Sequence, residues 1–393
     1  MIILRLIKAI LITTMSICAI LPLIFICFIA RLVKKTIDVG IGPEPLINNI
    51  YHKKALTDVG FTVETFVSSV YFITDKFDIR ADIILPGLFR AFRGYYLFLL
   101  SIFRYKCIYI YFTGGALGHT NILWRIEPFL YRLAGVKIVV MPYGGDVHDL
   151  TRTSNLEFKN AMSKDYPRFR LSRNRVSAKV DLWTKYASHV ISGCDWVEYM
   201  FHWDSLMLGH FSIDTDIWKP YTGVFANNKD EKRAFKILHA PNHRTIKGTK
   251  YFINSVEELK QEGFNVELVI IEKVSNDEIR KIMAEVDIVA DQLIVGWYAM
   301  FAIEAMAMGK PVLCYLREDF ENLYMLSGLI EKGEIPIINC KPDTVKEIIR
   351  NLIINKDGIP DIGRRSREYV IKHHSLDYIG SVFKSINNSL GIG

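Results

Sequence analysis

Residues 296–312, GWYAMFAIEAMAMGKPV, decide the fold of this chain. Their middle part is rich in alanine and methionine and ends at Gly309, and Pro311 follows, which is the usual signature of a helix end. The apolar run from Val312 predicts a buried strand. Glu304 lies inside the helical part. A carboxylate there, at the carboxyl edge of a parallel sheet, can hold the ribose hydroxyls of a nucleotide. An ordinary capped helix with one solvated glutamate fits the same pattern.

Two cations lie upstream of this stretch, in a loop that follows an apolar strand. Arg244 and Lys247 belong to residues 240–248, which are predicted to lie at the edge of a cleft. A guanidinium offers a planar fork and an ammonium a compact charge, so the pair suits a diphosphate. Two solvated surface cations are the alternative. The other elements predicted for this half are strands at 235–239, 266–271 and 287–290, and helices that end near 260 and span 366–374.

The first half of the chain shows the same alternation of strands and helices. Gly42 lies in a loop rich in glycine and proline after the first strand, where backbone amides can approach a phosphate. The polar residues 151–175 show little periodicity and are interpreted as a long loop over the cleft. Predicted strands cover 36–39, 62–67, 108–112 and 136–141, with helices over 51–58 and 122–133.

Three polar side chains follow predicted strands of the first half. His119 lies after one glycine pair, and Tyr143 and Asp146 flank a second pair. Sites form in the loops at the carboxyl edge of such sheets. Asp146 is the strongest candidate, because Gly-Gly-Asp after an apolar strand presents a carboxylate on permissive backbone. Ordinary turn residues are the alternative for each position.

Residues 9–30 are apolar and uncharged, with basic residues on both sides. Such a run is long enough to span a hydrocarbon core of about 30 Å. A membrane anchor over residues 1–35 is therefore predicted, with a cleaved signal peptide as the alternative. Residues 87–104 combine arginines with aromatic side chains. This pattern fits a helix in a membrane interface, or a core helix with a basic edge.

The composition limits the class of protein. At 393 residues the chain is long enough for two domains, and 50% hydrophobic residues exclude a disordered chain. The formal net charge of +7 suits an anionic membrane surface or phosphate-bearing substrates, and is too small and dispersed to indicate nucleic acid as a partner. Six cysteines without paired spacing are expected to be reduced thiols. No Asp-x-Asp motif stands at a strand end, so no metal is expected.

The stretch around Glu304 resembles the donor-site signature of retaining glycosyltransferases of the GT-B fold, family 4. That signature has two glutamates eight positions apart around a loop, and residues 304–312 match its second half. The first glutamate falls on Gly296 and is missing. The resemblance implies that Glu304 holds the donor ribose. The side chains that could contact the sugar in place of the missing glutamate are Trp297, Tyr298 and the pair Asp291–Gln292.

Other segments resemble the same family. Lys247 and Gly248 match its Lys-Gly pair at the diphosphate, Asp146 resembles its Gly-x-Asp loop, and residues 213–220 resemble its junction between domains. The resemblance implies two Rossmann-like domains facing a cleft. It places an acceptor domain at 36–218, a donor domain at 219–375 and a C-terminal helix at 376–393 that crosses back to the first domain.

The resemblance implies transfer of a sugar from a nucleotide-sugar to a lipid-linked or membrane-bound glycan, with retention, without metal or cofactor, in cell-surface polysaccharide synthesis. Together with the anchor, it places the catalytic domains on the cytoplasmic side of the inner membrane. A nucleotide-sugar epimerase and a degenerate transferase that acts as a scaffold remain as alternatives. The expected catalytic residues are Arg244, Lys247 and Asp146, and the expected donor contacts are Glu304, Arg244, Lys247, Gly296, Trp297, Tyr298 and Gly42.

Overall fold

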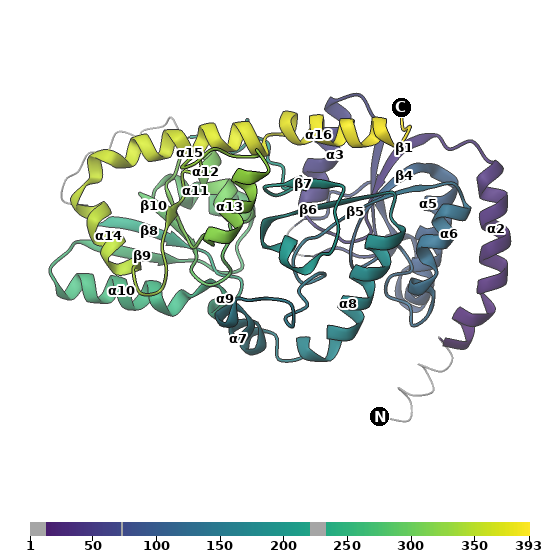
Figure 1. Cartoon of the computed structure of the whole chain (residues 1–393), viewed down its shortest axis with the longest axis horizontal. Helices are drawn as coiled ribbons and strands as arrows, with labels where there is room; N and C mark the ends of the chain where they lie inside the picture. Colours follow the sequence, from purple (N-terminus) through teal and green to yellow (C-terminus); the bar gives the residue numbers. More distant parts are fainter. Residues whose placement is uncertain (1–12, 72–73, 221–232) are drawn as a thin grey trace.

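The structure is a computed structural model that describes residues 13–71, 74–220 and 233–393. The chain forms two parallel β-sheets and completes the first before it enters the second. Figure 1 shows the two sheets side by side, each with its own set of helices. The predicted α/β class with parallel sheets is therefore confirmed.

The strands of the first sheet are β1 (Ile37–Ile41), β2 (Val63–Val67), β3 (Ile79–Arg80), β4 (Tyr105–Tyr111), β5 (Lys137–Met141), β6 (His189–Gly193) and β7 (Ser205–Met207). Their order is β3-β2-β1-β4-β5-β6-β7, and all pairs are parallel. Val39 of β1 lies opposite Val63 of β2 and Cys107 of β4. Strands β4 and β5 are buried along nearly their whole length, as a parallel sheet covered on both faces requires.

The strands of the second sheet are β8 (Phe235–His239), β9 (Val266–Ile270), β10 (Ile288–Gln292), β11 (Val312–Cys314) and β12 (Ile338–Asn339). Their order is β12-β11-β10-β8-β9. Val289 of β10 pairs with Leu238 of β8 on one side and Val312 of β11 on the other. Because every pair is parallel, the loops after β8, β10 and β11 leave the sheet at one edge, where sites form in such folds.

The helices of the first half are α2 (Ile20–Leu32), α3 (Asn48–Asp58), α4 (Ala81–Ile84), α5 (Arg93–Arg104), α6 (Glu127–Leu133), α7 (Leu156–Asp165) and α8 (Phe169–Tyr186), with short 3₁₀ turns η1 (Gly87–Phe92), η2 (Leu123–Arg125) and η3 (Cys194–Tyr199). Those of the second half are α9 (Arg244–Lys247), α10 (Thr249–Gln261), α11 (Asn276–Ala284), α12 (Met300–Ala307), α13 (Glu318–Leu326), α14 (Val345–Ile354), η5 (Lys356–Gly358), α15 (Ile359–His374) and α16 (Leu376–Ser389).

Most predicted elements are present within a few residues of their expected bounds, but the first half contains more structure than the sequence indicated. The predicted helix over 122–133 is split into η2 and α6, and Pro128 lies in the first turn of α6. Strands β6 and β7 were not predicted. The long loop expected at 151–175 is wrong, because α7 and the first part of α8 occupy it. Asn155 begins α7 by accepting the amide hydrogen of Phe158 at 2.9 Å.

The membrane anchor expected over residues 9–30 is not found. Residues 9–12 lie outside the described part of the chain; residues 13–18 are helical and α2 follows. In the part of the chain that the structure describes, no helix is long and apolar enough to cross a membrane. Helix α2 packs on α5 and α6 instead, because Leu23, Cys27 and Ala30 form a helical stripe that is buried against the first domain.

Two long helices connect the two halves. Figure 1 shows α15 and α16 following one another along the same side of both sheets. Helix α16 packs on α3 of the first half, where Gly380 lies so close that an added Cβ would meet the carbonyl oxygen of Ala55 at 2.7 Å. Asn387 accepts a hydrogen bond from the hydroxyl of Tyr109 in β4 at 3.0 Å. The end of the chain thus belongs to the first domain.

Candidate functional site

Glu304 lies in the second turn of α12, and its side chain is buried. The helix ends as the sequence predicts: Gly309 adopts φ +70°, and the amide of Lys310 donates to the carbonyl oxygen of Ala305 at 3.0 Å. Burial, and then the negative charge of Asp291, raise the pKa of Glu304 to about 8. A buried carboxyl group with an unfavourable charge nearby is held ready for hydrogen-bond donors from a ligand.

Lys247 is connected to Glu304 through Asp291. It ends the short helix α9, and its ammonium group forms an ion pair of 2.5 Å with Asp291, whose side chain is completely buried. The negative charge of Asp291 also acts on Glu304 and, after burial, raises its pKa. The loop after β8, the end of β10 and helix α12 therefore bring Lys247, Asp291 and Glu304 together at the carboxyl edge of the second sheet.

Arg244 lies one turn before Lys247 but has a different environment. Its side chain is exposed, and it forms an ion pair of 2.8 Å with Glu272 after β9. The amide of Ile246, in the same short helix, donates to the carboxylate of Asp165 at the end of α7. Each of the two cations predicted to bind the diphosphate is therefore paired with a carboxylate. A neighbouring amide also donates to one. The diphosphate role of Arg244 and Lys247 stays a prediction.

Gly296 stands where the family signature has its first glutamate. The side chain of Arg317 occupies the space beside it. Gly296 has φ +100°, and a Cβ there would meet Cδ of Arg317 at 2.6 Å. Arg317 is held in place by ion pairs with Glu198 at 2.9 Å and Asp319 at 2.6 Å. The missing glutamate thus coincides with a backbone conformation that favours glycine and with a buried arginine stem.

Gly296→Ala is expected to lower the free energy of unfolding by about 1–3 kcal/mol, because the change adds left-handed strain and a clash with a fixed arginine. Urea unfolding measures the effect. Gly60→Ala is the matched control, since Gly60 has φ +103° and open space around its Cβ position. Equal losses in the two variants would show that the Arg317 stem does not constrain residue 296.

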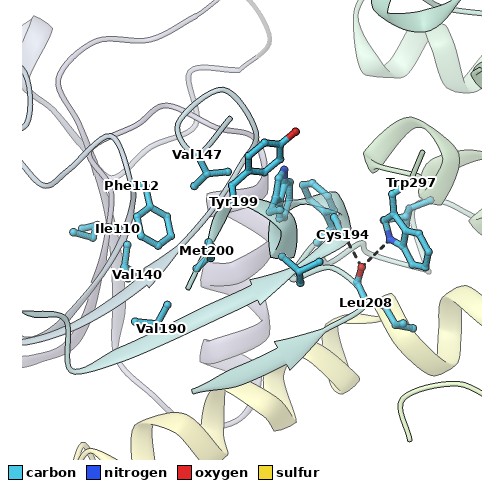
Figure 2. Packing of buried hydrophobic residues seen from close by; sticks show 14 of the residues in the cluster. Ile110, Phe112, Val140, Val147, Val190, Cys194, Tyr199, Met200, Leu208 and Trp297 are labelled. Atoms are coloured by element: carbon cyan, nitrogen blue, oxygen red, sulfur yellow. Dashed lines mark hydrogen bonds between the residues drawn. The ribbon is translucent and has the colours of Figure 1, made fainter. Parts of the chain in front are cut away.

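Trp297 and Tyr298 are both engaged in buried contacts, Trp297 with the first half and Tyr298 with α15 of the second half. The indole of Trp297 donates to the carbonyl oxygen of Leu208 at 3.0 Å, and Figure 2 shows it directed at that carbonyl beside the core of the first domain. The hydroxyl of Tyr298 lies 2.8 Å from that of Tyr369 and 3.0 Å from Nε2 of His374. Both side chains are almost fully buried. The bond of Trp297 joins the two domains, whereas Tyr298 ties its loop to α15; the predicted donor contact of both stays a prediction.

Gln292 shapes the loop that carries these residues. Its side-chain oxygen accepts the amide hydrogens of Ile294 at 2.8 Å and Val295 at 2.6 Å. Its side-chain nitrogen donates to the carbonyl oxygens of Trp297 and Tyr315, each at 3.0 Å. With all of these bonds made, Gln292 has no capacity left for a sugar. Of the substitutes considered for the first glutamate, Asp291 alone has its carboxylate beside Glu304.

Gly42 and Asp146 support the backbone at the carboxyl edge of the first sheet. The amide of Gly42 donates to the carbonyl oxygen of Tyr109 at 3.1 Å, and a Cβ on Gly42 would meet the carbonyl of Phe66 at 2.0 Å. Asp146 is buried and accepts the amides of Phe112, Tyr143 and Gly144 at 2.9–3.0 Å. Burial raises its pKa to about 6. Neither the phosphate contact of Gly42 nor the catalytic role of Asp146 is tested by this geometry, but both groups already have partners.

His119 has a partner that the sequence did not reveal. Its Nε2 lies 3.3 Å from the carboxylate of Glu44 in the loop after β1, and the His119 side chain is exposed. The loop before it is braced from two sides. Glu127 accepts the amide hydrogen of Leu117 at 2.7 Å, and Lys179 donates to the carbonyl oxygen of Gly118 at 2.9 Å. A fixed loop with an exposed imidazole is suited to contact a substrate hydroxyl.

A residue of the first domain approaches Glu304. Tyr51 of α3 accepts a hydrogen bond from the indole of Trp218 at 3.1 Å. Burial raises the pKa of Tyr51, and the charge of Glu304 adds to that rise. No sequence pattern pointed to Tyr51, because its approach to Glu304 depends on the way α3 is placed against the second domain.

The pKa of Glu304 makes stability depend on pH. Its folded-state pKa is raised from 4.5 to about 8, so the neutral form stabilises the fold. This contribution is complete below the ordinary glutamate pKa and is lost as the pH rises through about 8. The free energy of unfolding is expected to fall from about pH 5 to about pH 9. Glu304→Gln should flatten this dependence; an unchanged slope in urea titrations would assign it to another group.

A large cavity lies elsewhere in the cleft. Its volume is about 1090 Å³, and the start of α7 and the loops after β10, β11 and β12 line it, among them Asn155, Tyr315 and Lys341. Neither Glu304 nor Lys247 lines this cavity. Within residues 13–71, 74–220 and 233–393, no three His, Cys, Asp or Glu side chains gather as a metal site would require.

The chain is similar in fold to solved glycosyltransferases. Sucrose-phosphate synthase from Thermosynechococcus elongatus matches with a TM-score of 0.58 and 12% identity, over 90% of this chain and 98% of the other. HepE from Anabaena in complex with UDP and glucose matches with a TM-score of 0.54 and 13% identity, over 90% and 100%. HepE in complex with UDP-glucose matches at 0.53. No protein-family model and no curated protein matches the chain. The chain therefore has the GT-B fold of these enzymes.

Proposed function

We propose that the protein is a glycosyltransferase that moves a sugar from a nucleotide-sugar to a membrane-associated glycan or lipid-linked acceptor, with retention and without a metal. The observation that carries the proposal is the group of Lys247, Asp291 and buried Glu304 at the carboxyl edge of the second sheet of a GT-B fold. A solved structure of similar fold, HepE, is in complex with UDP-glucose.

In the proposed donor site, two charged residues bind different parts of the nucleotide-sugar. Glu304 accepts hydrogen bonds from the ribose hydroxyls, which favour its ionised form. Lys247 supplies positive charge to the diphosphate, and Asp291 fixes its position. Donor binding should thus strengthen as the pH rises toward the pKa of Glu304, about 8.

The proposed reaction needs no protein nucleophile. The bond between the anomeric carbon and the diphosphate oxygen breaks, and Lys247 neutralises the charge that grows on the leaving group. The acceptor hydroxyl forms its bond to the same face of the anomeric carbon, and its proton passes to the departing diphosphate. His119, beside Glu44, lies on a braced loop of the first domain and is proposed to orient the acceptor hydroxyl.

The acceptor is proposed to lie at the cytoplasmic face of the inner membrane. The proposal rests on the apolar N-terminal run, on the basic balance of the chain and on the need for a cytoplasmic nucleotide-sugar. A catalytically degenerate scaffold is the second candidate, and one observation favours it: Gly296 replaces a signature glutamate, and Arg317 fills the space beside it.

Calorimetric binding of UDP and GDP tests the donor site. Wild-type protein is expected to bind one of them, and Glu304→Ala to weaken that binding by about 1–3 kcal/mol, the scale of a lost charge-assisted hydrogen bond. Glu257→Ala removes the same charge from an exposed position of α10 and serves as the control. Equal affinity in wild type and Glu304→Ala would overturn the ribose assignment.

A further inference from the structure

One edge of the first domain exposes large apolar side chains. Figure 1 shows α2 along the outer edge of that domain, on the side away from the second sheet. While one stripe of α2 is buried, its other face remains in contact with solvent. The exposed side chains on this helical region are Met15, Ile17, Leu21, Phe25, Phe28, Ile29 and Leu32, with Leu21 exposed by 77% and Leu32 by 87%.

A second apolar segment lies beside the start of this helical region. All residues of η1 are exposed, with Leu88 at 97% and Phe89 at 58%. Helix α5 follows η1 directly, and the hydroxyl of Tyr95 in its first turn lies 3.3 Å from that of Ser16. This contact links the two segments, and we define them together, residues 13–33 and 83–92, as the apolar edge. Large exposed apolar side chains gathered on one domain in this way mark an interaction site.

The charged residues in the segments of the apolar edge are all basic. Residues 1–37 and 83–106 contain no aspartate or glutamate. Among the residues that the structure describes, Arg31, Lys34 and Arg90 make no ion pair with a carboxylate. Asp82, just before the edge, is paired with Arg80 at 3.0 Å. Exposed apolar side chains bordered by unpaired cations fit an anionic lipid surface.

Two arginines extend the apolar edge toward the loop that carries His119. Arg125 and Arg175 lie over the ring of Trp124, at 4.4 and 5.5 Å from its centroid. Neither forms an ion pair with a described carboxylate, and the side-chain amide of Asn121 donates to the hydroxyl of Thr13 at 3.0 Å. Arg175 also donates to the carbonyl oxygens of Gly118 and Thr120, on both sides of His119.

We propose that this edge docks on an anionic phospholipid bilayer, with the apolar side chains in the interface and Arg125 and Arg175 at the level of the lipid phosphates. The inference rests on the proposed function, because it places the His119 loop next to a membrane-bound acceptor. An acceptor whose head group carries phosphate would meet the same two arginines. Binding strength should follow buried apolar area and electrostatic attraction together.

Co-sedimentation of the full chain with vesicles tests the docking. One set contains phosphatidylcholine alone and the other equal parts of phosphatidylcholine and phosphatidylglycerol. Wild-type protein is expected to sediment with the anionic set and to be released by salt. Leu88→Ser/Phe89→Ser and, separately, Phe25→Ser/Phe28→Ser should each lower partitioning at least ~10-fold. Arg125→Gln/Arg175→Gln should remove the preference for the anionic set.

Leu326→Ser/Ile354→Ser is the control, because both side chains are exposed, by 89% and 62%, on α13 and α14 of the second domain. Thermal unfolding by circular dichroism confirms that each variant is folded. Wild-type protein that stays in the supernatant, or edge variants that sediment like the control, would overturn the proposal. So would edge variants that convert a dimer to a monomer without affecting sedimentation. The assay uses no nucleotide, so its failure leaves the donor site to be judged by UDP and GDP binding.

Discussion

Lys247→Met is expected to lower the rate of sugar transfer about 10²–10³-fold, the usual cost of removing one preorganised charge that stabilises a transition state. The charge on the leaving diphosphate grows as the bond to the sugar breaks, so the loss should fall mainly on kcat. Steady-state kinetics with the cognate donor measures it. A change confined to KM would contradict the role of Lys247 in the transition state.

The variant also leaves Asp291 buried without its partner, which is destabilising in its own right. Lys247→Met/Asp291→Asn separates the two effects, since the neutral amide no longer needs a cation. The double variant is expected to recover much of the lost stability and none of the lost rate. Recovery of the rate in the double variant would mean that Lys247 serves only to neutralise Asp291.

Trp297→Ala is expected to lower the free energy of unfolding by about 3–5 kcal/mol, the range for a large buried aromatic side chain. The indole is 2% exposed and packs against the rings of Tyr298 and Tyr324, with centroid distances of 5.3 and 4.8 Å. Its hydrogen bond to Leu208 joins the two domains. Urea unfolding followed by circular dichroism measures the loss.

Trp297→Phe is the matched control, because it keeps an aromatic ring and loses the indole donor. The carbonyl oxygen of Leu208 still accepts the amide hydrogen of Cys194 at 3.2 Å, so the cost should be only about 1 kcal/mol. If Trp297→Ala unfolds as easily as Trp297→Phe, the packing between the domains does not depend on this side chain.

The apolar N-terminal run shows what a sequence pattern cannot predict. An apolar stretch predicts burial, and it does not tell whether lipid or protein covers the helix. Here the buried side chains of α2 are at positions 23, 27 and 30, a helical spacing that was present in the sequence. The helix was predictable, whereas its contact with α5 and α6 depends on surfaces built from residues about seventy to a hundred positions away.

The segment 151–175 was misread for a different reason. Its helices are polar. Their stability comes from contacts with distant parts of the folded chain, such as the hydrogen bond from Asn155 to the carbonyl oxygen of Ile294 at 2.8 Å. The one local signal was the capping of Phe158 by Asn155, a residue type favoured at helix starts. Such a cap predicts where a helix begins only if a helix is already expected.

In the candidate site, the sequence was sufficient to predict the position of residues whose place follows from the backbone, while their roles stay predictions. Glu304 was placed by the helix stop at Gly309, and Lys247 by the loop after β8. Trp297 and Tyr298 could not be assigned in this way, because their partners, Leu208 and His374, come from other parts of the chain. The pairing of His119 with Glu44 was hidden for the same reason.

Release of nucleoside diphosphate from a panel of UDP-, GDP- and other nucleotide-sugars decides whether this protein transfers a sugar. Purified protein is incubated with each donor, with and without a bacterial lipid extract as the acceptor source. Glu304→Ala and Glu257→Ala are run in parallel. We expect release from one donor that requires the lipid and falls in Glu304→Ala but not in Glu257→Ala. Nucleotide binding without release from any donor would contradict this expectation and would favour a scaffold.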